Sequence, residues 1–217
     1  MLVFDIETAP QSIEEIQRIL PPFDASELDA GVDPVEAERL HWEEVVSKAP
    51  LSAVVGSVVA IGYKADAMVD LHTVIDDSES EVVACFWDRY RNIRQHRQPV
   101  IGFNSNSFDI PFLCQRSWIL GITVPSTVFT QTGYLDFTFV DLRKRWLAGQ
   151  YKSNFRGHSK LDTVCKAMGI PGKPSDCTGA EFHRLLLSGD QAECEAALSY
   201  LRNDVSITYQ VAKRMGY

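Results

Sequence analysis

The stretch LVFDIET, residues 2–8, joins an apolar start to two carboxylates, Asp5 and Glu7. Side chains two residues apart on a β-strand point to the same face, so a strand here would set these like charges side by side. Their repulsion is tolerated where water solvates both groups at an exposed strand end, or where a cation lies between them. The exposed end is the commoner case for an isolated pair, because patterns this short recur by chance. A metal site would need further carboxylates from elsewhere in the chain.

Length and composition predict a soluble protein with one sizeable domain. The chain has 217 residues, of which 45% are hydrophobic and 23% charged, and these values are ordinary for a globular fold. The longest apolar stretch, residues 53–63, is too short and too interrupted by glycine to cross a bilayer, and no secretory signal is expected. The five cysteines are odd in number, widely spaced and never in a C-x-x-C pair. They predict a reducing, cytoplasmic setting without a zinc site or a disulfide framework.

Charge is unevenly distributed along the chain. The formal net charge of −8, taken as a total, argues against a nucleic-acid partner. Residues 1–50 hold 12 acidic and 3 basic side chains, a net of −9, whereas the remaining 17 acidic and 18 basic side chains give +1. Residues 143–160 carry six Lys or Arg, one His and no acid, with Trp146, Tyr151 and Phe155 between them. This cationic stretch is either a solvated surface loop or a surface for phosphates and bases.

The periodicity of apolar residues predicts a mixed α/β fold. Strands are expected over residues 2–6, 53–63, 68–75, 99–104 and 135–142, and helices over 79–97, 108–120, 159–168, 178–188 and 190–215. Residues 11–49 are expected to be mostly helical, with Asp33 as an N-cap and Pro34 at the first helical position. This order of elements fits a mixed sheet with helices on its faces. Carboxylates at the carboxyl ends of neighbouring strands would then converge on one cleft.

Two later stretches carry further carboxylates. In VIGFNSNSFDIPFL, residues 100–113, Asp109 follows an apolar strand and a polar loop, so it would either cap the next helix or face the first strand. In SYLRNDVSITYQVAKR, residues 199–214, Tyr200 and Asp204 are four residues apart and share one helical face. Because they border an apolar face, a Tyr–Asp pair at a core boundary is the simpler interpretation of this stretch alone.

Together the three stretches resemble the three motifs of the DEDD exonuclease superfamily, in the branch that carries tyrosine. FDIET looks like the first motif, GFNSNSFDIPFLCQR like the second and YLRNDVSITYQVAKR like the third, and SKLDTVCKAMGIPGK is similar to the helix between the last two. The branch with histidine would have that residue where Ser199 stands, next to Tyr200. The likeness is closest to stand-alone proteins similar to the proofreading exonuclease domain of family B DNA polymerases. It implies a ribonuclease-H-like α/β fold, with a mixed five-stranded sheet flanked by helices. Residues 1–217 would be a single exonuclease domain, in which 11–50 are an acidic helical insertion after the first strand.

The resemblance also implies roles for individual residues. Four carboxylates would bind two divalent ions, Mg²⁺ or Mn²⁺, since hard cations prefer oxygen ligands: Asp5, Glu7, Asp109 and Asp204. Tyr200 would orient the attacking water. Three side chains are implied to contact the terminal nucleotides, namely Thr8, Asn104 and Phe108. Lys160 would contact the scissile phosphate, although it also fits an ordinary surface lysine.

The activity implied by the resemblance is 3′-to-5′ hydrolysis of phosphodiester bonds, with release of nucleoside monophosphates from single-stranded DNA ends. RNA is an alternative substrate, because no residue visibly recognises the sugar 2′-hydroxyl. A nucleic-acid-binding module without catalysis is the alternative outside enzymes. A polymerase or a repair protein would be a partner in trans, and no membrane partner is expected.

Two interpretations are open for the acidic insertion, residues 11–50. It could lie beside the mouth of the active site, where its acids would repel duplex DNA and leave the cationic stretch as a path for one strand. Its helices could instead pack on the far side of the sheet, with the acids merely solvated. That packing would use five apolar residues: Ile16, Leu20, Leu40, Trp42 and Val45.

Overall fold

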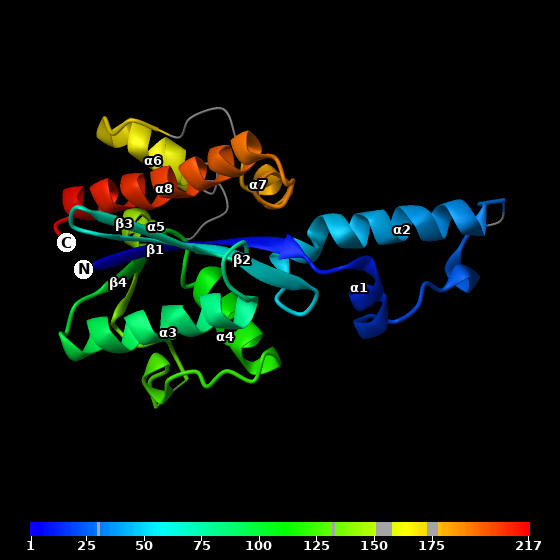
Figure 1. Cartoon of the computed structure of the whole chain (residues 1–217), viewed down its shortest axis with the longest axis horizontal. Helices are drawn as coiled ribbons and strands as arrows, with labels where there is room; N and C mark the ends of the chain where they lie inside the picture. Colours follow the sequence, from blue (N-terminus) through cyan, green and yellow to red (C-terminus); the bar gives the residue numbers. More distant parts are fainter. Residues whose placement is uncertain (30, 132, 151–157, 173–177) are drawn as a thin grey trace.

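One mixed sheet organises the computed structural model of the protein, which describes residues 1–29, 31–131, 133–150, 158–172 and 178–217. Its strands are β1 Leu2–Pro10, β2 Gly56–Ala65, β3 Met68–Thr73, β4 Val100–Gly102 and β5 Phe139–Asp141. They lie in the order β3-β2-β1-β4-β5 (Figure 1). β1 is antiparallel to β2 and parallel to β4, so the first strand is the centre of the sheet. The mixed five-stranded sheet expected from the sequence is confirmed.

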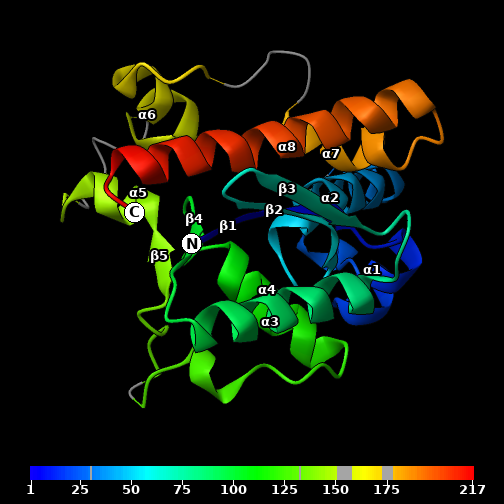
Figure 2. The ribbon, with the colours of Figure 1, turned by 60° about the vertical axis from the view of Figure 1, so that its left-hand side comes forward.

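Helices cover both faces of this sheet. The helices are α1 Ile13–Ile19, α2 Pro34–Lys48, α3 Glu79–Gln95, α4 Asp109–Ile119, α5 Leu142–Leu147, α6 Leu161–Met168, α7 Gly179–Leu186 and α8 Gln191–Arg214. Short 3₁₀ turns occur at η1 Ala25–Glu27, η2 Ala49–Leu51 and η3 Ser126–Val128. α6, α7 and α8 lie on one side of the sheet, and α3 and α4 lie on the other (Figures 1 and 2). Among the described helices, none has the length and apolar character needed to span a membrane.

Side chains of β1 alternate between two cores. Val3 and Ala9 pack in the core beneath α8, whereas Phe4 and Ile6 pack in the core formed with α3 and α4. Because successive side chains of a strand point to opposite faces, the two carboxylates between these residues belong to the α8 face. The alternation thus directs the charged pair toward the longest helix of the molecule.

Gly62 allows α8 to lie close to the sheet. A Cβ atom on Gly62 would be 2.9 Å from Leu201 Cγ and 3.0 Å from Val205 Cγ1, which is closer than carbon atoms normally approach. A glycine in a strand often marks such a close approach. Gly62 is the ladder partner of Asp5 in the β1–β2 pairing, so the absence of its side chain brings α8 next to this carboxylate.

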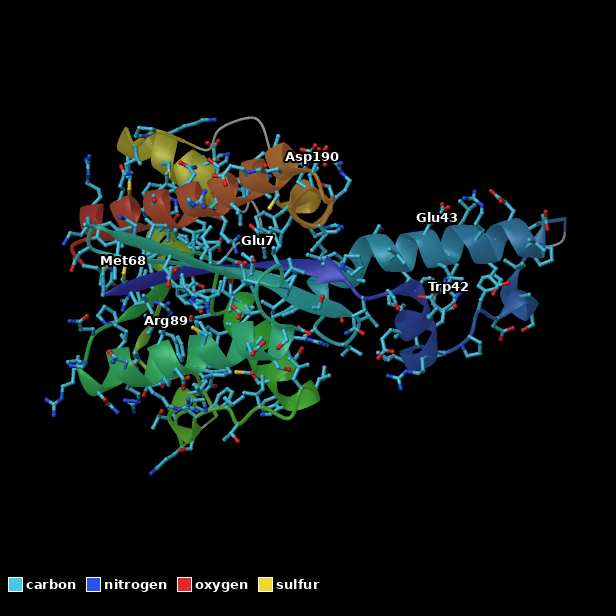
Figure 3. All side chains as sticks on the ribbon, viewed as in Figure 1. Glu7, Trp42, Glu43, Met68, Arg89 and Asp190 are labelled. Carbon is cyan, nitrogen blue, oxygen red and sulfur yellow. The ribbon has the colours of Figure 1, made fainter. Side chains whose placement is uncertain are left out.

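Residues 11–50 form an arm between β1 and β2. Three of its residues, Ile16, Trp42 and Ala49, form a small separate core together with Val55, which directly precedes β2. α2 extends away from the sheet (Figure 1), and Figure 3 shows Trp42 on the side of α2 that faces α1. The expectation that Leu40 would be buried is wrong, since half of its surface is exposed. The arm therefore packs on itself rather than across the far side of the sheet.

Most element predictions are confirmed, including Asp33 as the N-cap of α2 with Pro34 in the first turn. The strand expected over residues 135–142 is confirmed only at its end, because Asp136 accepts hydrogen bonds from the backbone and hydroxyl of Thr138 and forms a local turn. Phe137 at this turn is 93% exposed.

The cationic stretch, residues 143–160, also differs from a plain loop. Its first residues form α5, which Asp141 caps by accepting the backbone N–H groups of Arg143 and Lys144. Tyr151 and Phe155 of this stretch lie outside the described residues.

Candidate active site

Three carboxylates from two of the sequence motifs lie together between β1 and α8: Asp5, Glu7 and Asp204. One carboxylate oxygen of each lies within 4.8 Å of the others. Glu7 is 8% exposed, Asp204 is 2% exposed and Asp5 is half-buried. Figure 3 shows Glu7 beside β1 on the side of α7 and α8.

The chemistry of this cluster fits a divalent cation. Three like charges with little access to water repel one another, and a cation between them removes that repulsion. Carboxylate oxygens are the ligands that Mg²⁺ and Mn²⁺ prefer. A cation held by Asp5, Glu7 and the Asp204 carboxylate of α8 would explain why two same-face charges are tolerated on β1.

Tyr200 lies one helical turn before Asp204 and is also buried. Its hydroxyl Oη would lie 3.7 Å from a Cβ atom built on Gly179, and Glu7 Oε2 would lie 3.9 Å from the same atom. The ring of Tyr200 is 6.3 Å from that of Phe182, between ring centres, so α7 supports it from one side. The phenol hydroxyl therefore faces the same small space as the carboxylates.

Asp109 approaches β1 from the opposite helical layer. It is the first residue of α4, whose N-cap is Phe108, so the simple capping role considered from the sequence does not occur. Instead, its Oδ1 accepts the backbone N–H of Ile6 at 3.3 Å. Asp109 is thereby tied to the strand between Asp5 and Glu7, although it is not one of the three clustered carboxylates.

Burial is the main influence on the protonation of the Asp109 carboxyl group. The pKa of Asp109 is raised to about 7, chiefly by burial and also by the nearby Asp141 carboxylate, while the backbone N–H groups of Asp109 itself and of Ile6 act to lower it. A carboxyl group in such a setting gains stability as an anion when a cation lies close by.

Asp141 is a buried residue beside the candidate site that the sequence reasoning missed. Its carboxylate accepts the backbone N–H groups of Asn104 at 3.0 Å and Asn106 at 3.3 Å, and so holds the loop that leads into Asp109. Arg143 adds to this network by donating to Asn104 Oδ1 at 3.0 Å and to Ser159 Oγ at 3.1 Å. A signal was available, because an Asp between an apolar strand and a basic helix is a typical N-cap.

The residues expected to contact the substrate divide into two groups. Thr8 and Phe108 line a pocket of about 570 Å³ that also includes Glu7. The Thr8 hydroxyl donates to the carbonyl of Pro50 at 2.7 Å. Asn104 and Lys160 are not among the described residues of this pocket, since Asn104 belongs to the Asp141 network and Lys160 is exposed at the start of α6.

Comparison with known protein families gives a direct result. Residues 46–217 match a family described as "Predicted 3'-5' exonuclease related to the exonuclease domain of PolB". The chain belongs to this family. Three site residues, Asp109, Tyr200 and Asp204, lie within the residues matched to this PolB-related exonuclease family, whereas Asp5 and Glu7 precede them. No curated protein matches the chain.

A solved structure extends the likeness to the whole fold of this family member. The family B DNA polymerase from the hyperthermophilic archaeon Pyrobaculum calidifontis superimposes with a TM-score of 0.60 at 20% sequence identity. The match covers 99% of this chain and 24% of the polymerase chain, so the chain spans about a quarter of the polymerase's length. At this identity the likeness concerns the fold, and it confirms the ribonuclease-H-like fold class.

Proposed function

We propose that this member of the PolB-related exonuclease family is a metal-dependent 3′-to-5′ exonuclease that acts on single-stranded DNA and releases nucleoside monophosphates. The observation that carries the proposal is the convergence of Asp5, Glu7 and Asp204 within 4.8 Å, on a fold of this family. Hydrolysis of a phosphodiester builds negative charge on phosphoryl oxygens. A buried anionic cluster can assist such a reaction only when cations lie between its carboxylates and the negatively charged phosphoryl oxygens.

The three clustered carboxylates would hold Mg²⁺ or Mn²⁺, and Asp109 would support a second ion from its place beside Ile6. Bound divalent ions supply Lewis acidity toward the phosphoryl oxygens and lower the pKa of a bound water. The side chains of the protein hold these ions and exclude water. Low exposure of Glu7 and Asp204 keeps bulk water from screening their charges.

Tyr200 is proposed to position the attacking water through a hydrogen bond of its hydroxyl. A phenol hydroxyl can both donate and accept a hydrogen bond, so orientation of the water rather than proton removal is its proposed role. Its neighbour Phe182 restricts the ring, and the hydroxyl faces the space next to Glu7. Holding a reactant in one orientation removes part of the entropic barrier to the reaction.

The substrate strand is proposed to enter through the pocket that Thr8 and Phe108 line. Phe108 offers an aromatic face for a base, and such stacking tolerates any base sequence. Asn104 is proposed to contact the terminal nucleotides and Lys160 the scissile phosphate, both from outside the described lining of this pocket. Single-stranded rather than duplex DNA is proposed because one unpaired end has to reach carboxylates that are nearly buried.

The test uses 5′-labelled single strands of DNA and RNA with the same sequence. With Mg²⁺ or Mn²⁺ we expect shortening from the 3′ end, complete loss of activity in chelator, and recovery when metal is returned. Asp204→Asn, a neutral replacement of similar shape, should lose activity by about a thousandfold while its thermal unfolding stays cooperative. Full activity in chelator, or near-native activity of this variant, would refute the proposal. Faster cleavage of the RNA strand would reassign the substrate.

A further inference from the structure

The pocket beside the carboxylates has a wall that comes from the arm. Glu7, Thr8 and Phe108 form one side of the pocket, and the end of α2 with the η2 turn forms another through Val46, Pro50 and Leu51. Arm and site thus meet at a single cavity, although α2 itself extends away from the sheet (Figure 1). The family match begins at residue 46, the first residue of this wall.

This wall is held firmly against β1. The hydroxyl of Thr8 donates to the carbonyl of Pro50, and Gln11 donates its backbone N–H to Val55 and its side-chain amide to the carbonyl of Gly56, both at 3.0 Å. A Cβ atom on Gly56 would lie 2.5 Å from the carbonyl oxygen of Ala49, so the turn packs backbone to backbone on the strand. The wall keeps its distance to Glu7 because both are attached to the same strand.

Leu51 is the exposed apolar side chain of this wall. It is 72% exposed although it lines a cavity, while Val46 is half-buried beside it. A single exposed leucine is unremarkable on a surface. Here it lines the same pocket as Glu7, one of the three clustered carboxylates suited to metal ions. A ligand with an anionic end that metal can bind and a flat apolar end matches both sides of this pocket.

We propose that the base of the 3′-terminal nucleotide packs against Val46, Pro50 and Leu51, so that the end of the arm and the η2 turn supply the base-binding wall of the site. The inference rests on the proposed function, and it gives the end of the arm a role in substrate binding. The wall offers apolar contact to the base, so all four bases should be accepted to a similar degree. The terminal base has to leave its duplex partner before it can enter.

Several charges of the arm are paired within α2. Glu36 and Glu43 both pair with Arg39, and Glu44 pairs with Lys48, so part of the negative charge on α2 is offset locally. These exposed pairs are also screened by salt. The wall would favour an unpaired 3′ end whether or not the charges of the arm repel duplex DNA.

The test compares Leu51→Ala with the wild type on two 5′-labelled single strands, one with a normal 3′ end and one whose last residue lacks its base. Val35→Ala is the matched control, since Val35 is 75% exposed on the same arm and is not among the described residues of the pocket. On the normal strand Leu51→Ala should lower kcat/KM by about tenfold, the factor expected when a leucine side chain loses an apolar contact. On the abasic strand it should change nothing, and Val35→Ala should match the wild type on both.

The outcomes separate the two proposals. An active wild type with Leu51→Ala unchanged on the normal strand would overturn the base-binding wall and leave the exonuclease proposal standing. An equal loss on both strands would show that Leu51 acts on the fold of the pocket, and would also overturn the inference. A wild type that cleaves no strand with Mg²⁺ or Mn²⁺ would overturn the proposed function and the wall with it.

Discussion

Gly62→Ala should impair catalysis through a residue that touches no substrate. The added methyl group would lie 2.9 Å from Leu201 Cγ and 3.0 Å from Val205 Cγ1, where carbon atoms normally stay about 3.5–4.0 Å apart. Leu201 and Val205 are fully buried and follow Tyr200 and Asp204 directly in α8. The helix therefore has to move outward by about 0.5–1 Å, taking both site residues with it.

The size of the effect follows from this displacement. Overpacking a core lowers the free energy of unfolding by about 1–3 kcal/mol. Replacing a glycine raises it by about 0.5–1 kcal/mol, because the unfolded chain then has less conformational freedom to lose. A net loss of about 1–2 kcal/mol lowers the Tm of a chain of this length by about 2–8 °C. A misplacement of about 1 Å costs up to about a hundredfold in rate, so kcat should fall about 10- to 100-fold. The loss of activity should thus far exceed what the lost stability explains.

The assay measures kcat on single-stranded DNA together with thermal unfolding. Val83→Ala is the control, because Val83 is buried on the α3 side of the sheet and should lose comparable stability without touching α8. The double variant Gly62→Ala with Leu201→Ala removes the closest clash and should recover part of the lost kcat.

A lowered Tm with unchanged kcat would refute the reasoning. It would mean that α8 can shift without moving the site, or that the pair Tyr200 and Asp204 is not catalytic. Failure of the Leu201→Ala rescue would show that the clash with this side chain is not the cause.

Three further predictions address single contacts of the site and its support. Tyr200→Phe should lower kcat about 10- to 100-fold with little change in strand binding, because only the water-orienting hydroxyl is removed; an unchanged kcat would reduce Tyr200 to a packing residue. Gly179→Ala should keep or raise the Tm, since alanine is a better helix former than glycine. It should reduce turnover, because its methyl group would occupy the space 3.7 Å from Tyr200 Oη. Full activity would mean that the reaction does not use the space between Gly179 and Tyr200. Glu79→Gln should cost about 3–5 kcal/mol in urea unfolding, because it leaves the buried Arg116 without its charged partner; a loss below about 1 kcal/mol would contradict this estimate.

Local sequence patterns were sufficient for the elements and for part of the site. Strand alternation alone put Asp5 and Glu7 on one face, and helical spacing put Tyr200 and Asp204 on another, because both periodicities follow from backbone geometry. The burial of Leu201 and Val205 agrees with the apolar face predicted for the last helix. The strand over residues 135–142 was overestimated, since an Asp turn interrupts an alternation that looks regular in the sequence.

Only the tertiary structure decided how these pieces meet. Contact between Asp109 and the backbone of Ile6 joins residues more than a hundred positions apart, and no local period encodes such a pairing. The close approach of α8 to the sheet depends on one glycine in β2, Gly62. Nothing in the sequence around Gly62 indicates that Leu201 and Val205 of α8 pack against it.

The same holds for the wall built by Pro50 and Leu51 beside Glu7. The sequence shows that the arm is acidic and helical. Its end reaches the site because the chain returns after α2 to β1, where Thr8 binds the carbonyl of Pro50 and β2 then pairs with β1. Periodicity tells which side of an element is buried. Which two elements face each other, and at what distance, is set by the packing of side chains that lie far apart in the chain.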